Sequence, residues 1–192
     1  MLQRLSETNR FHPKECLYYS DIYLSYESLD WQSYRINPER YVDCHLFCFE
    51  CIMCEEMETI KVDIMNEKAK QFFMDLWGDK SNAVHADALI RTCADLINET
   101  ELDKTVFVIA AWLHDLGKVK DIENHSFESM NFLDVFIQQN PEANKWYNEV
   151  ADCILHHESK STPDTVYGKI FQFANIKSRE HPIWLDFVKT GQ

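Results

Sequence analysis

The sequence predicts an all-α protein, and three observations support this prediction. Only four of the 192 residues are Gly and five are Pro, so few residues interrupt a helix. Alternation of apolar and polar residues, which is typical of strands, is scarce along the chain. Residues 106–113 are apolar on every face, as expected of a helix buried at the centre of a fold.

The first half of the chain is expected to contain four helices, at residues 13–34, from 37–38 onward, at 58–77 and at 82–98. Asn37 is a favourable N-cap, and Pro38 is tolerated at the first helical position. Gly78 is a normal residue to end the third helix, and Asn82 is expected to cap the fourth.

The second half is expected to contain five helices, at residues 101–116, 124–138, 141–157 and 161–177, and a short one after Pro182. Gly117 ends the first of these helices. Pro141 begins the third, and Ser161-Thr162-Pro163 begins the fourth. We therefore expect a helical core domain over residues 81–192, with an N-terminal helical segment over residues 1–80 packed on it.

Charge and composition exclude several kinds of partner. The formal net charge is −13, and an acidic surface repels phosphate backbones, so a nucleic-acid partner is unlikely. The four Gly residues are too dispersed for a Rossmann, P-loop or α/β-hydrolase motif. The first ten residues lack the apolar core of a secretory signal, and the apolar stretch 105–113 is shorter than the roughly 18 residues of a membrane span. We expect a cytoplasmic protein without a membrane partner, and the sequence leaves its oligomeric state open.

Four of the seven cysteines lie in the second expected helix. On a helix they form a stripe about 120° wide, which is the usual width of a core face. Free Cys is often buried, and structural zinc sites usually place Cys pairs on turns. The spacing therefore favours a core face over a zinc or iron–sulfur site. These residues are Cys44, Cys48, Cys51 and Cys54.

Histidines recur near the ends of four successive expected helices. A His and an Asp at the end of a buried helix cost free energy unless they are paired or bind a metal ion. An up-and-down bundle can bring such helix ends around one cavity. Imidazoles with a carboxylate suit Mn, Fe, Co, Ni or Zn, one or two ions per chain, better than Ca. The residues are His85, His114 with Asp115, His125, and the pair His156 and His157.

This order of residues, with the segment AWLHDLGK at 111–118, resembles the HD-domain superfamily of metal-dependent phosphohydrolases over about residues 80–180. The resemblance implies an HD-type helical bundle in which His85, His114 and Asp115 hold a first metal ion. Asp115 would bridge to a second ion held by His125 and by His156 or His157, with His156 preferred. Asp115 and Lys118 would be catalytic, with Lys118 neutralising phosphate charge.

One position departs from the family pattern. The family closes the first metal site with an Asp on a late helix, and Asn175 stands at this position. An amide oxygen can bind a metal ion, but it is neutral and a poorer ligand than a carboxylate.

The resemblance implies hydrolysis of a small phosphoester, such as a nucleotide, by metal-activated hydroxide. Three alternatives stay open: a degenerate binding or regulatory protein, because of Asn175; a di-iron oxygenase, which uses the same ligand set; and a CRISPR-associated HD-type nuclease, against which the net charge argues.

Overall fold

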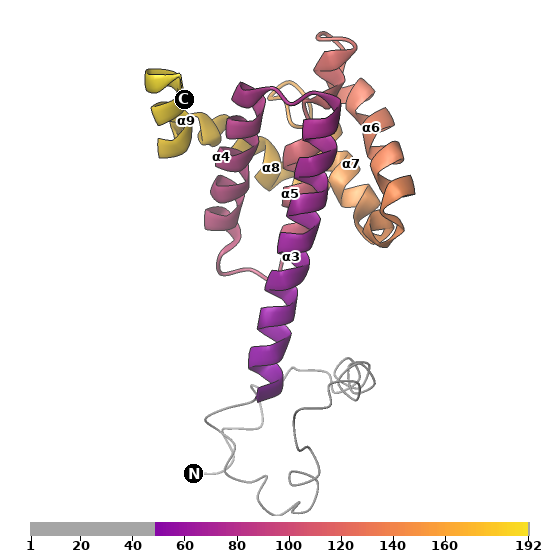
Figure 1. Ribbon diagram of the computed structural model, residues 1–192, viewed down its shortest axis with the longest axis vertical. Helices are drawn as coiled ribbons and strands as arrows, with labels where there is room; N and C mark the ends of the chain where they lie inside the picture. The colour runs from indigo at the N-terminus through magenta and orange to yellow at the C-terminus, as the bar shows by residue number, and fades with distance from the viewer. Residues whose placement is uncertain (1–48, 192) are drawn as a thin grey trace, which may run out of the picture. The chain divides into compact units, whose positions relative to one another are not determined.

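The computed structural model describes residues 49–191, with side chains from residue 57 onward. Within this range the chain forms seven α-helices and no strand, which confirms the predicted all-α class (Figure 1). The helices are α3 (Phe49–Leu76), α4 (Lys80–Ile97), α5 (Lys104–Leu113), α6 (His125–Gln139), α7 (Tyr147–Leu155), α8 (Val166–Lys177) and α9 (Pro182–Thr190). Three short 3-10 helices connect them: η3 (Leu116–Val119), η4 (Pro141–Trp146) and η5 (Ser178–Glu180).

The chain divides into two compact units, Met1–Met57 and Glu58–Gln192. The core contacts and the candidate site described below belong to the second unit. The first expected helix, Cys44 and Cys48 lie outside the described residues, as do the side chains of Cys51 and Cys54. The domain boundary between residues 80 and 81 stays a prediction.

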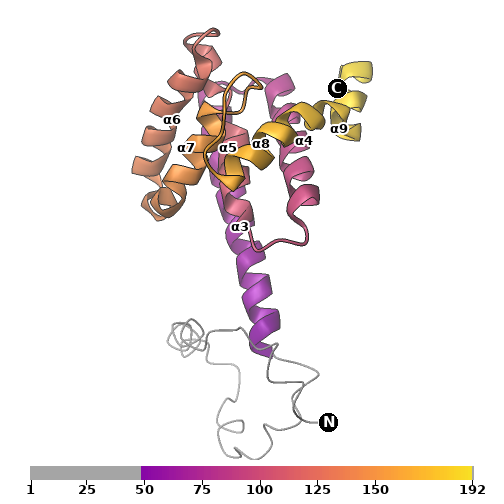
Figure 2. The ribbon, with the colours of Figure 1, turned by 180° about the vertical axis from the view of Figure 1, so that it is seen from behind.

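Helix α5 forms the centre of the second unit. Every residue from Thr105 to Leu113 is buried, in agreement with the all-round apolar sequence. Both views show α5 between α4 on one side and α6 and α7 on the other (Figures 1 and 2). Burying a large apolar side chain stabilises a fold by about 1.5–3 kcal/mol, so α5 is a rigid base for the residues that follow it.

Helix α3 packs on this core through its C-terminal half. The ring of Phe73 lies 5.5 Å from that of Trp112, and the ring of Phe72 lies 5.5 Å from that of Phe136. The indole of Trp112 donates a hydrogen bond of 2.8 Å to Asn66. This bond satisfies the indole N–H, which is otherwise surrounded by apolar side chains.

The starts of two helices differ from the prediction. Helix α3 begins at Phe49 and runs through the break expected before residue 58. Helix α4 is capped by Asp79 instead of Asn82, because the Asp79 carboxylate accepts a hydrogen bond of 2.8 Å from the Asn82 backbone N–H. A carboxylate at this position also interacts favourably with the helix dipole.

Three of the helices around the predicted site, α5, α7 and α8, are shorter than expected. Helix α5 ends at Leu113, and the chain tightens into η3. The segment 141–157 starts as η4 before it becomes α7. Helix α8 begins after Thr165, whose side chain accepts a hydrogen bond from the Gly168 N–H, and not at residues 161–163. Among the described residues, no helix combines the length and the apolar character that crossing a membrane requires.

Candidate metal centre

His114 and Asp115 lie at the junction between α5 and η3. His114 is the C-cap of α5, and its backbone N–H still bonds to the Ala110 carbonyl. Because the helix stops there, both side chains reach the same region beyond its end. Both residues are buried, with exposed fractions of 2% and 7%.

The junction is fixed against α6 by Ser129. The Ser129 hydroxyl donates to the His114 carbonyl at 2.7 Å and accepts from the Gly117 N–H at 2.8 Å. A Cβ atom on Gly117 would overlap the backbone carbonyl of His125, so only Gly permits this close approach. Sequence reasoning missed Ser129, although its position four residues after His125 places both on one face of α6.

Three histidines share one arrangement of hydrogen bonds. In each, the Nδ1 atom bonds to the backbone carbonyl three residues earlier: His114 to Ala111 at 2.9 Å, His125 to Ile122 at 2.8 Å and His157 to Ile154 at 2.7 Å. A carbonyl only accepts, so Nδ1 carries the proton in all three rings. In the neutral form of each ring the lone pair is therefore on Nε2, the arrangement that a hydrogen bond from Nδ1 to a carbonyl imposes on metal-binding histidines.

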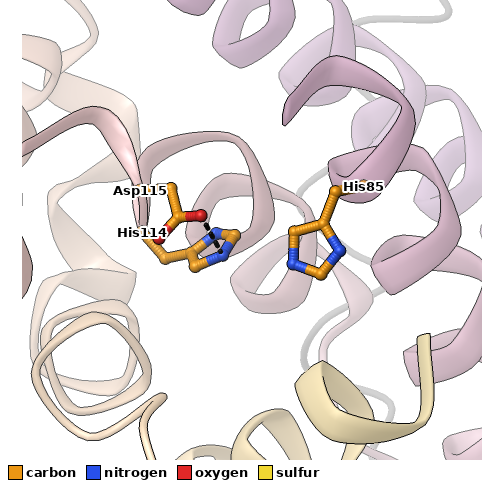
Figure 3. A group of neighbouring side chains, drawn as sticks. All are labelled: His85, His114 and Asp115. Carbon is orange, nitrogen blue, oxygen red and sulfur yellow. Dashed lines mark ion pairs between the residues drawn. The ribbon is translucent and has the colours of Figure 1, made fainter. Parts of the chain in front are cut away.

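The His114 Nε2 atom is buried and has no hydrogen-bond partner. It lies 3.5 Å from the Asp115 Oδ2 atom, and His85 faces this pair from α4 (Figure 3). A buried lone pair beside a carboxylate is unfavourable unless a cation lies between them. The ligand atoms of His85, His114 and Asp115 all lie within 4.8 Å of one another, so these residues fit a metal ion.

A second group shares Asp115 with the first. The Nε2 atoms of His125 and His157 lie 3.0 Å apart. They lie 3.4 and 3.7 Å from the Asp115 Oδ1 atom, whereas Oδ2 is the atom near His114. Two lone pairs at this separation repel each other unless a proton or a metal ion joins them. The chemistry of this second group therefore also fits a metal ion.

The His85 ring is held by the C-terminal part of the chain. Its Nε2 atom lies 2.9 Å from the Asn175 Oδ1 atom, and its ring lies 5.6 Å from that of Trp184 in α9. The Asn175 side-chain amide also donates to the His157 carbonyl at 3.2 Å. The side-chain oxygen of Asn175 thus lies beside the first group, and its side-chain nitrogen supports the backbone of His157.

Burial sets the protonation states. Desolvation lowers the pKa values of His85, His114 and His157, that of His114 to about 3. These rings are neutral at physiological pH, which is the form that binds metal ions. Burial alone would raise the pKa of Asp115, but the neighbouring His114 and Lys118 hold it well below its usual range. The carboxylate is therefore ionised.

The structure does not bring His156 to either group, and the preference for His156 over His157 does not fit the geometry. His156 is the C-cap of α7, and its Nε2 atom turns back to within 3.7 Å of Asp152. The next residue along the turn, His157, points to Asp115. His156, Asp152 and Asp164 form a separate group of possible ligands.

The Asp152 carboxylate has another role, which sequence reasoning missed. It accepts hydrogen bonds from the Asp164 and Thr165 backbone N–H groups at 3.1 and 2.9 Å, and from the Thr165 hydroxyl at 2.6 Å. Asp152 therefore anchors the start of α8, the helix that carries Asn175. In the sequence this role is marked only by an Asp four residues before His156.

A cavity of about 460 Å³ opens over the two groups. Lys118 lines it, and its ammonium forms an ion pair with Asp115. The cavity is therefore large enough for a small ligand whose polar end contacts the buried residues. The lining residues are His85, Asp115, Lys118, Ile122, His125, His157, Glu158, Ser159, Lys160, Asn175, Ile176 and Arg179.

Comparison with known proteins identified one family. The family model described as "HD domain" matches residues 83–179, which is just over half of the chain and includes every residue of both groups. No curated protein and no solved structure matched the chain.

Proposed function

Because the chain belongs to the HD domain family, a superfamily of metal-dependent phosphohydrolases, we propose that it hydrolyses a small phosphoester, such as a nucleotide, with the help of bound divalent transition-metal ions. One observation carries the proposal. Four buried imidazoles converge on a single carboxylate, and lone pairs in both groups lack a proton donor. A bound cation supplies the missing partner in each group.

The two groups supply the proposed ligands. His85, His114, Asp115 and Asn175 would hold one metal ion, and Asp115, His125 and His157 would hold the other. Metal ions in such a site polarise a phosphoryl oxygen and lower the pKa of water.

Lys118 would orient the phosphate. Its ammonium pairs with Asp115 at the wall of the cavity. Lys118 lies in η3, three residues after Asp115. A substrate phosphate entering there would share this ammonium with Asp115. A fixed cation aimed at the non-bridging oxygens stabilises the charge that these oxygens carry in the transition state.

A panel of phosphomonoesters, including nucleoside monophosphates, tests this function. Protein reloaded with Mn or Fe should release phosphate, and a chelator should abolish the activity. Lys118→Met should lower kcat about 100-fold, because removing one donor to the developing charge has effects of this size. Lys120→Met is the matched control, because Lys120 lies two residues away, pairs with Glu128 and does not line the cavity.

Asn175 favours a second candidate function. A neutral amide completes the first group less strongly than a carboxylate, which suits a binding or regulatory module with weakened catalysis. If the wild-type protein binds metal without turnover, and Asn175→Asp gains hydrolysis, the second function is correct. Metal-dependent turnover by the wild-type protein rejects it.

A further inference from the structure

The cavity over the metal centre is lined by cationic side chains that have no role in holding the metal ions. Its lining includes three cationic residues but only two carboxylates, Asp115 and Glu158. Lys118 pairs with Asp115, and Glu158 lies 3.8 Å from His125. Lys160 and Arg179, in contrast, form no ion pair with any acidic side chain of residues 57–191. On a chain with a net charge of −13, this local surplus indicates an anion-binding surface.

The loop that carries Lys160 is held in a defined conformation. The side-chain amide of Gln172 donates to three of its carbonyls, those of His156, Glu158 and Ser161, at 2.8, 2.6 and 3.0 Å. The Ser161 hydroxyl adds a bond of 2.8 Å to the Glu158 carbonyl. The loop that carries Lys160 is therefore ordered before any ligand binds, and this lowers the entropic cost of binding.

Arg179 follows the C-terminal end of α8, seven residues after Gln172, which holds the Lys160 loop. It lies in η5, where the buried Ser178 hydroxyl donates to the Asn175 carbonyl at 2.9 Å. The adjacent acidic residue, Glu180, pairs with Lys177 at 3.1 Å. The Arg179 guanidinium is thus exposed and free to bind an incoming anion.

We propose that Lys160 and Arg179 bind a second phosphate group of the substrate, so that the preferred substrates are phosphoesters that carry two phosphates. This proposal rests on the proposed function, because the first phosphate would occupy the metal centre with Lys118. Arginine presents paired N–H donors that match phosphate oxygens, and lysine adds a compact charge. A monophosphate leaves both cations without a partner.

Calorimetry with two non-hydrolysable probes tests this subsite. Methylphosphonate carries one phosphonate and methylenediphosphonate carries two, and the Mn²⁺ concentration is kept equal in cell and syringe. Wild-type protein should bind the diphosphonate about tenfold more tightly or better, as expected for additional charge-assisted hydrogen bonds. A diphosphonate also binds metal ions more strongly, so the comparison with variants decides the question.

The double variant Lys160→Met/Arg179→Met should lose most of the preference for the diphosphonate and keep the affinity for methylphosphonate. Gln172→Leu, which leaves both cations in place but frees the loop, should reduce the preference in part. Lys169→Met removes a charge from α8 outside the cavity and should change neither affinity.

A preference that survives in the double variant, an equal loss in Lys169→Met, or no diphosphonate binding by the wild-type protein would overturn the subsite. Binding needs no turnover, so a subsite that behaves as expected in a protein without hydrolysis would reject only the proposed function.

Discussion

The side-chain oxygen of Asn175 lies 2.9 Å from the Nε2 atom of His85, although the two residues are separated by 90 positions in the chain. The nitrogen of the same amide donates to the His157 carbonyl. One side chain thus contacts both groups of the metal centre, and the choice of an amide over a carboxylate affects both.

Asn175→Asp should therefore have opposite effects on the metal-free and metal-loaded protein. Without metal, a carboxylate replaces the donor to the His157 carbonyl, and the free energy of unfolding should fall by about 1–3 kcal/mol. With metal, the added negative charge should tighten binding by about one order of magnitude. Chemical denaturation with and without Mn²⁺ measures both effects. A variant that is as stable as the wild type without metal and binds Mn²⁺ no better would contradict this role of Asn175.

His156→Gln and His157→Gln form a matched pair of adjacent substitutions. His157→Gln should lose at least one equivalent of bound metal, because the Nε2 atom of His157 lies beside the Nε2 atom of His125 and the Oδ1 atom of Asp115. His156→Gln should keep the wild-type metal content, because its ring faces Asp152. Metal analysis checks both, and thermal melting confirms that each variant is folded. The reverse pattern would restore the preference for His156.

Ser129→Ala should weaken the metal centre without removing a ligand. It leaves the buried Gly117 N–H and the His114 carbonyl without their partner, at a cost of about 1–3 kcal/mol in the free energy of unfolding. Because Ser129 no longer fixes the backbone around His114, the affinity for metal should also fall about tenfold or more. Ser126→Ala, on the same helix but half-buried, is the control and should change stability by about 0.5 kcal/mol or less. Equal effects of the two substitutions would show that Ser129 does not position His114.

Most residues of the two candidate ligand groups could be selected from the sequence, because they follow helix ends in a fixed order along the chain. The all-α class also followed from the sequence, since residues 106–113 are apolar on every face. The choice between His156 and His157 could not be predicted, because a change of one residue at the end of a helix rotates the side chain by about 100°. That choice depends on where α7 stops, and its last turn is set by tertiary packing.

The residues that support the site through backbone hydrogen bonds could not be predicted from the sequence either. Ser129 and Asp152 each bond to backbone groups of another segment, at a separation of 12–15 positions. Such partners become visible only when the helices are packed. The caps show the same limit, because both Asp79 and Asn82 are good N-cap residues and only the backbone path selects Asp79.

Stability of the metal-free protein should fall as the pH is lowered from about 6.5. The pKa values of His85, His114 and His157 are lowered in the folded state, so the unfolded chain binds more protons below its ordinary histidine pKa. For His114 this window extends from about 6.5 down to its folded pKa of about 3. Each such group contributes a slope of up to about 1.4 kcal/mol per pH unit. The lowered pKa of Asp115 acts in the same direction, but only below about pH 4.

Urea denaturation between pH 4 and 7.5 measures this slope, and His114→Gln should reduce it. The titratable groups that surround His114 are Asp115, His157 and His85, and they are unchanged in that variant. A metal-free protein whose stability is constant from pH 7 to pH 4.5 would contradict the assignment of neutral, buried imidazoles.

Metal content per chain, measured by elemental analysis after reloading with Mn or Fe, tests the two-ion centre most directly. We expect close to two equivalents in the wild-type protein and the loss of at least one in His114→Ala, with the helical circular dichroism of that variant retained. A wild-type protein that binds no metal after reloading, or a His114→Ala variant with unchanged metal content, would contradict it.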